Sequence, residues 1–343
     1  MFEGVLPAII TPFKRNPSMS LDIQGLEKNI GFLLSCGIHG IVPCGSTGES
    51  ATLTFEEHEK VIKVTVDKVN GKIPVLAGTG SNNTAEAIRL TKAAKDIGAD
   101  GVLAISPYYN KPNRAGLIKH YHKLADLDIP VIVYNVPSRT GQNLEPDVIA
   151  ELAQHPNIWG VKEASGNISQ ISRIIEETQD EDFLVISGDD NITLPIMALG
   201  GAGVISVAAN VDPKRMVAMY DALMFGDYQK ALVLNFALSP LFRSMFIDTN
   251  PIPVKKAMEL IGLAGGPVRL PLDELDAKKT EMLKKVLATL PKPAGKTSAG
   301  KKPAATKKAP AKKAAVSKAV KPGIKTAAKK ATPKRAVKPA ARR

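Results

Sequence analysis

The most constraining feature of this sequence is a series of eight short apolar runs separated by amphipathic stretches. Most runs are continuous in Val, Ile, Leu and Ala, which is typical of parallel strands covered on both faces. Apolar residues three and four apart predict helices between them, for example over 54–70, 84–97 and 145–154, with Thr54 and Glu57 as a capping box. The predicted strands span residues 5–13, 40–48, 73–81, 101–109, 129–137, 158–165, 183–190 and 203–210.

Eight strand–helix units favour a closed (β/α)₈ TIM barrel over residues 1–211. An open doubly wound sheet shares the alternation and is the alternative, which the count of eight disfavours. Residues 212–290 hold more helical pattern than one further unit requires, and they predict a C-terminal helical subdomain.

Residues 291–343 have a composition of their own. They contain 18 of the 46 Lys and Arg residues and no Asp or Glu, so residues 1–290 carry a net charge of −5. The Lys/Ala/Pro repeats predict a disordered basic tail that binds nucleic acid or other polyanions without sequence specificity. A nucleic-acid-associated protein acting through this tail is therefore one alternative function, and a solvated tail without a partner is another.

Other sequence features bear on location. No apolar window reaches the roughly 18 residues needed to cross a membrane, and the N-terminal residues lack a secretion signal. Cys36 and Cys44 suggest neither a disulfide framework nor a metal site. We expect a cytoplasmic protein without membrane contact.

In such a barrel, the residues at the carboxyl ends of the strands face the active site. This set holds one lysine, several hydroxyls and glycine turns, but no histidine and no carboxylate cluster, which favours amine catalysis over metal or phosphoryl chemistry. The five histidines are scattered, and we expect no metal. The strand-end residues are Ser46, Thr47, Tyr108, Tyr109, Tyr134, Lys162, Gly188 and Ile205.

Lys162 follows the apolar run that begins at Ile158. Burial there would lower the pKa of its ammonium and leave a neutral amine that can form a Schiff base with a ketone. The alternative is a lysine whose side chain extends to solvent.

Two other strand ends carry polar groups suited to the same chemistry. Tyr134 could relay protons and Arg139 could bind a carboxylate, although a packed ring and a surface ion pair explain them as well. The "GSTGES" turn over 45–50 could hold an anion with its amides and hydroxyls, or serve only as a structural turn.

These pieces together resemble the dihydrodipicolinate synthase family of pyruvate-dependent class I aldolases. The resemblance runs from Met1 to about Leu290 and is highly specific, because its motifs occur in family order and spacing. They are "GSTGESATL", "AGTGSNNTAEAI", "PYYNKP", "YNVPSRTG", "GVKEASGN", "SGDD", "GVISV" and "NPIPVK".

The resemblance implies a reaction and roles for the residues. Pyruvate would form an imine on Lys162 and condense with L-aspartate 4-semialdehyde in lysine and diaminopimelate biosynthesis, with no other cofactor. Tyr134 would move protons through Ser46 and through Tyr109 of a neighbouring subunit in a homotetramer. Thr47, Gly188 and Ile205 would form the pyruvate pocket, and Arg139 would bind the carboxylate of the semialdehyde.

The resemblance also implies an allosteric lysine site at Ser50, Ala51, His58, Asn82, Glu86 and Tyr108. Phe55 stands where some lysine-sensitive relatives have histidine, and Ser46 where members often have threonine. N-acetylneuraminate lyases and 2-keto-3-deoxy sugar acid aldolases are the enzymatic alternative, which Arg139 disfavours because the sialic acid lyases lack that arginine.

Overall fold

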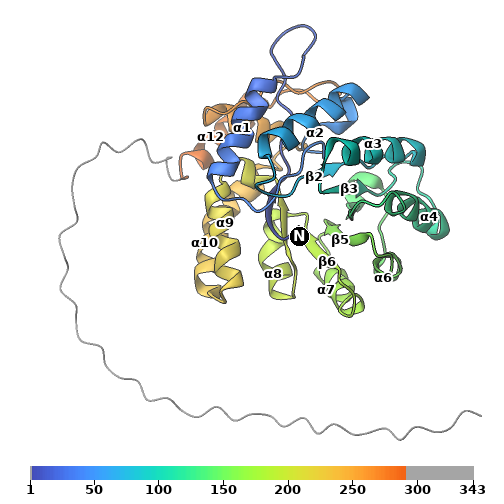
Figure 1. The fold of residues 1–343 in the computed structure, drawn as a ribbon. Helices are drawn as coiled ribbons and strands as arrows, with labels where there is room; N and C mark the ends of the chain where they lie inside the picture. The colour runs from blue at the N-terminus through green and yellow to red at the C-terminus, as the bar shows by residue number, and fades with distance from the viewer. Residues whose placement is uncertain (1, 291–343) are drawn as a thin grey trace, which may run out of the picture. The chain divides into compact units, whose positions relative to one another are not determined.

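The structure is a computed structural model that describes residues 2–290. Its centre is a parallel sheet with the strand order β1-β7-β6-β5-β4-β3-β2, and helices surround it (Figure 1). The strands are β1 (Gly4–Pro7), β2 (Leu76–Gly78), β3 (Gly101–Ile105), β4 (Val131–Asn135), β5 (Ile158–Glu163), β6 (Leu184–Ser187) and β7 (Gly203–Ser206).

The segment predicted as the second strand closes the sheet into a barrel. Val42 pairs with Ala8 just after β1, and Ile41 pairs with Val75 just before β2, both in parallel. This segment forms only isolated bridges because Pro43 cannot donate a ladder hydrogen bond and Cys44 adopts a left-handed φ of 56°. The predicted (β/α)₈ barrel is confirmed, with a second strand much shorter than 40–48.

The helices follow the predicted apolar periodicity. Helices α2, α3 and α6 lie where the sequence predicts them, and the Thr54–Glu57 capping box at the start of α2 is present. The helices before the C-terminal region are α1 (Ile23–Ser35), α2 (Phe55–Val69), α3 (Thr84–Ile97), α4 (Arg114–Ala125), α5 (Pro137–Thr140), α6 (Pro146–Ala153), α7 (Ile168–Glu177) and α8 (Thr193–Ala198).

After the last strand the chain is helical, as expected. A hydrophobic cluster joins these helices to Val5 of β1 and Val204 of β7. The division at residue 211 stays a prediction, and the predicted disordered tail lies outside the described residues. The last helices are α9 (Pro213–Met224), α10 (Tyr228–Ser244), α11 (Ile252–Leu260) and α12 (Ala277–Leu287).

Candidate active site

Lys162 and Tyr134 are neighbours at the carboxyl ends of adjacent strands. They are register partners of β5 and β4, and each is 7% exposed. The Nζ atom of Lys162 lies 4.1 Å from the centroid of the Tyr134 ring. The parallel register therefore places an amine beside a phenol inside the barrel mouth.

The surroundings of Lys162 disfavour its charged form. Its pKa is lowered to about 7, chiefly by burial and also by the nearby Arg139 cation, while Asp190 opposes the shift. The Oδ2 atom of Asp190 accepts hydrogen bonds from the backbone N–H groups of Val207 and Ala208 at 3.1 and 2.9 Å. This carboxylate oxygen is therefore directed toward the backbone and not toward Lys162. Burial also raises the pKa of Tyr134 to about 12, so its hydroxyl keeps its proton near neutral pH.

Lys162 opens into a cavity of about 730 Å³. Gly188 at the end of β6 is needed for this, since a Cβ there would lie 3.1 Å from both Cγ and Cε of Lys162. Six of the predicted catalytic and substrate-binding residues line the cavity: Ser46, Thr47, Tyr134, Arg139, Lys162 and Gly188.

The turn over residues 45–50 lies at one wall of this cavity. Its backbone is tied internally, with Gly48 N–H donating to Gly45 O at 3.0 Å and Glu49 N–H donating to Ser46 O at 3.2 Å. Thr47 is buried, and its Oγ1 accepts a hydrogen bond of 3.0 Å from the side-chain amide of Asn250. Because the Thr47 hydroxyl is the acceptor in this bond, its proton remains available to donate a hydrogen bond to a bound anion.

Asn250 also holds Arg139, and sequence reasoning assigned it no role. The backbone carbonyl oxygen of Asn250 accepts a hydrogen bond of 3.1 Å from Nη2 of Arg139. Asn250 precedes α11 and stands at no strand end, so the strand-end rule did not find it. The signal was its position in the "NPIPVK" motif.

Two predicted site residues lie away from the cavity within the described chain. Tyr109 is 89% exposed and has a left-handed φ of 74°, so within one chain it points to solvent. Ile205 belongs to the apolar cluster inside the barrel, and Val207, two residues further on, lines the cavity.

A second cavity of about 490 Å³ shares Ser46, Tyr134 and Arg139 with the first. Five residues of the predicted lysine site line it, namely Ser50, Ala51, His58, Glu86 and Tyr108, and Phe55 lines it too. Asn82 is not among the lining residues. Burial lowers the pKa of His58, whose Nε2 lies 2.7 Å from Gly78 O, so its ring is neutral at pH 7.

Within residues 2–290, no three His, Cys, Asp or Glu side chains gather in a way that could hold a metal ion. No helix in that range has the length and apolar character needed to span a membrane.

A neutral lysine amine at a barrel strand end is the arrangement with which lyases of the class I aldolase type form a covalent imine with a ketone. The chain is an enzyme of this class. Its particular family follows from comparison with known proteins.

The model of the dihydrodipicolinate synthetase family matches residues 1–290, and the chain belongs to this family. The 4-hydroxy-tetrahydrodipicolinate synthase of Methanoculleus marisnigri is 73% identical over 287 residues, covering 84% of this chain and 99% of the relative. The enzyme of the same name from Methanosphaerula palustris is 70% identical over 289 residues, with the same coverage. The crystal structure of dihydrodipicolinate synthase from Aquifex aeolicus has 45% identity and a TM-score of 0.81, covering 84% of this chain and 97% of that one.

Proposed function

We propose that this chain condenses pyruvate with L-aspartate 4-semialdehyde to give 4-hydroxy-tetrahydrodipicolinate, and that Lys162 carries the pyruvate as an imine. The observation that carries the proposal is the burial of Lys162, which lowers its pKa to about 7. At neutral pH a large fraction of this amine is unprotonated and nucleophilic.

The first step is formation of the imine. The Lys162 amine attacks the ketone carbon of pyruvate, and the resulting carbinolamine loses water. The pyruvate carboxylate binds the turn over 45–50, where the Thr47 hydroxyl and the turn N–H groups that make no bond within the turn donate to it. Ser46 and Gly188 lie at the same cavity, and Ile205 belongs to the apolar cluster that also contains Tyr134.

The second step is carbon–carbon bond formation. The pyruvate methyl loses a proton, and the enamine attacks the aldehyde carbon of the semialdehyde, whose oxygen then takes up a proton. Tyr134 moves these protons, because its ring lies against Lys162 and its hydroxyl remains protonated. Ser46 and the Tyr109 of a neighbouring subunit complete the relay, which makes a homotetramer part of the active form.

The third step releases the product. Arg139 binds the carboxylate of the semialdehyde, and its guanidinium is oriented by the Asn250 carbonyl. The amine of the substrate attacks the imine carbon, which closes the ring and frees Lys162. The sequence of steps needs no external cofactor.

The test follows pyruvate consumption with L-aspartate 4-semialdehyde and, in parallel, with N-acetylmannosamine. A second sample is reduced with borohydride in the presence of pyruvate and mapped by peptide mass. Turnover with the semialdehyde and a pyruvyl adduct on Lys162 are expected. An adduct with turnover of N-acetylmannosamine alone would assign another acceptor, and absence of an adduct would contradict the imine mechanism.

Regulation and location complete the proposal. Free lysine binds the second cavity through Ser50, Ala51, His58, Glu86 and Tyr108, with Asn82 at its margin, and the enzyme acts in the cytoplasm.

The basic segment 291–343 lies beyond the family match and binds polyanions non-specifically. Truncation after Leu290 should abolish retention on DNA and leave turnover unchanged.

A further inference from the structure

A second lysine, Lys255 of α11, is buried close to the turn that holds Thr47. Its residue exposure is 1%, and its ammonium donates to Glu49 Oε1 at 2.6 Å, to Pro267 O at 2.6 Å and to Thr11 O at 3.0 Å. Each of its three N–H groups therefore has an acceptor. No step of the proposed reaction uses this lysine.

Glu49 belongs to the turn and is held on both of its carboxylate oxygens. It is 4% exposed and adopts a left-handed backbone conformation with φ 54° and ψ 38°. Such a conformation costs a residue with a side chain about 1–2 kcal/mol and persists where the surroundings enforce it. Here both carboxylate oxygens are held, Oε1 by Lys255 and Oε2 by the backbone N–H of Arg269 at 2.9 Å.

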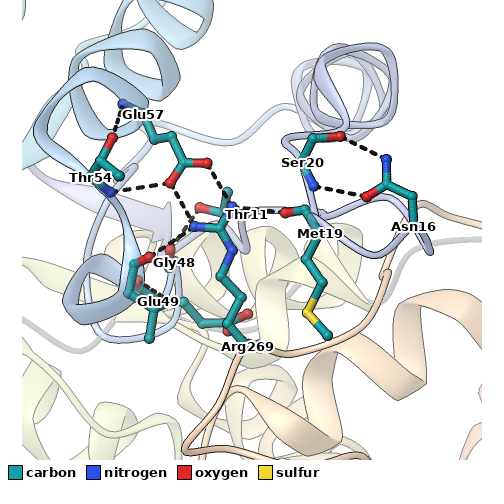
Figure 2. A network of polar contacts seen from close by, with 10 residues as sticks. Thr11, Asn16, Met19, Ser20, Gly48, Glu49, Thr54, Glu57 and Arg269 are labelled. Carbon is teal, nitrogen blue, oxygen red and sulfur yellow. Dashed lines mark hydrogen bonds and ion pairs between the residues drawn. The ribbon is translucent and has the colours of Figure 1, made fainter.

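The same network reaches the start of α2. Arg269 donates to both carboxylate oxygens of Glu57 at 2.6 Å and to Met19 O at 2.8 Å, as Figure 2 shows. Glu57 in turn caps α2 through Thr54. Glu49 within the 45–57 segment and Glu57 at its end are consequently held by Lys255 and Arg269 from the C-terminal region.

Lys255 also supports the turn from a second side. It binds the backbone oxygen of Thr11, whose hydroxyl donates to Gly48 O at 2.7 Å. Five residues earlier on the same segment, the Asn250 amide donates to Thr47. The segment from Asn250 to Lys255 thus hydrogen-bonds to the turn at Thr47 and at Glu49, and contacts Gly48 indirectly through Thr11.

Stability alone does not explain a charged pair at this position. Replacing a buried ion pair by apolar residues of similar volume is often neutral or stabilising, so such a pair is weak grounds for a purely structural role. An apolar pair makes no directional contacts. Only the charged groups form several hydrogen bonds, and these fix the orientation of the turn relative to the residues around it.

We infer that Lys255 and Glu49 are positioning residues, which set the turn over 45–50 so that Thr47 and the turn amides bind the pyruvate carboxylate. The inference rests on the proposed function, because it assigns the turn to pyruvate. Neither residue touches the substrate. Their loss should weaken pyruvate binding more than it slows the steps after imine formation.

The test measures the borohydride-trapped adduct on Lys162 against pyruvate concentration in the full-length chain, together with kcat and KM. Lys255→Met should raise the half-saturating pyruvate concentration and KM about tenfold, as expected for a binding group displaced by a fraction of an ångström. The adduct should still form in full at saturating pyruvate. Lys256→Met is the matched control, because Lys256 forms a more exposed pair with Glu259 at 2.9 Å on the same helix, and it should behave as wild type.

Two further variants separate positioning from folding. Glu49→Gln keeps the shape and should raise the half-saturating concentration in the same direction, so it carries the test if Lys255→Met does not fold. The double variant Glu49→Leu/Lys255→Met removes both charges and should fold while pyruvate binding stays weak. A folded single or double variant that binds pyruvate as wild type does would overturn this inference alone. Absence of any adduct on wild-type Lys162 would overturn the proposed function and this inference with it.

Discussion

Residues 2–290 bury two lysines, Lys162 and Lys255, and their ammonium groups meet opposite surroundings. Each lies over an aromatic ring, Lys162 at 4.1 Å from the Tyr134 centroid and Lys255 at 4.4 Å from the Phe13 centroid. Only Lys255 has a carboxylate, Glu49, in contact with its ammonium at 2.6 Å.

This difference decides what each lysine can do. Burial lowers the pKa of both. At Lys255 the charge and hydrogen bond of Glu49 oppose this lowering while Arg269 adds to it, and at Lys162 Arg139 adds to it while Asp190 opposes it. Lys255 is suited to hold structure as a cation, and Lys162 is suited to react as an amine. Burial of a lysine thus predicts reactivity only where no anion is in direct contact with its ammonium.

The largest expected effect is that of Lys162→Met. The adduct should disappear and turnover should fall by at least about a thousandfold, because the nucleophile is gone. Thermal stability should rise by a few degrees, since folding no longer requires burial of a charge-bearing group. Turnover and calorimetric melting are the measurements, and a lower Tm would contradict the comparison.

The stability gain of Lys162→Met should decrease as the pH rises. The folded-state pKa of Lys162, about 7, lies below the usual lysine value of 10.5, so between these values the unfolded chain binds the additional proton. The cost to wild type is full below pH 7 and vanishes above about 10.5. The excess Tm of Lys162→Met should therefore shrink as pH rises through this window.

Tyr134→Phe makes the ring beside Lys162 resemble the one beside Lys255. The ring contact remains but the hydroxyl is lost, so kcat should fall by about 10² to 10³ with little change in Tm. Rapid-quench trapping at saturating pyruvate locates the loss in the proton-transfer steps. A kcat near that of wild type would remove Tyr134 from the relay.

Lys255→Met should lower stability, the opposite sign to Lys162→Met. It leaves the Glu49 carboxylate buried without its cation, which costs about 3–5 kcal/mol. The expected fall in Tm is roughly 10 °C. Lys256→Met serves as control with a change within about 1 kcal/mol, and equal shifts in both variants would contradict the special role of the buried pair.

Arg139→Met tests the cation near Lys162. The pKa of Lys162 should rise, but only part of the way toward its usual value, because burial is the larger cause of its shift. The rate of adduct formation, which increases as the amine deprotonates, should then reach its midpoint at a higher pH than in wild type. The KM for the semialdehyde should rise as well, and an unchanged pH midpoint would show that Arg139 does not act on the amine.

The smallest expected effect is that of Ser46→Thr in the turn between the two lysines. The hydroxyl is kept and the added methyl restricts its rotamer, so kcat should rise by no more than about threefold. Ser46→Ala is the matched comparison, and it should lower kcat. Equal kcat values for the Thr and Ala variants would exclude Ser46 from the relay.

Much of the fold was predictable because its signals are local. Continuous apolar runs marked all eight strand positions, and a capping pair marked the start of α2. The length of the second strand was predicted wrongly, because Pro43 and the left-handed Cys44 end its pairing after two bridges. The sequence pattern did not show this, since the apolar run continues through Pro43.

Part of the site was also predictable from the sequence. Lys162, Tyr134 and Thr47 followed from the rule that strand ends face the barrel mouth. Asn250 and the Lys255–Glu49 pair were not found, since their partners lie about 200 residues away along the chain. Long-range side-chain pairing leaves no periodic trace in a sequence.

The sequence by itself determined that the chain forms a barrel and that the basic segment begins after Leu290. It also placed one lysine, Lys162, at the end of the sixth predicted strand and no histidine at any strand end. The tertiary structure alone decided which charges surround each buried lysine. The physical reason is that a pKa depends on burial and on the nearest charges, and only the folded chain brings Glu49 to Lys255 and leaves Lys162 beside Arg139.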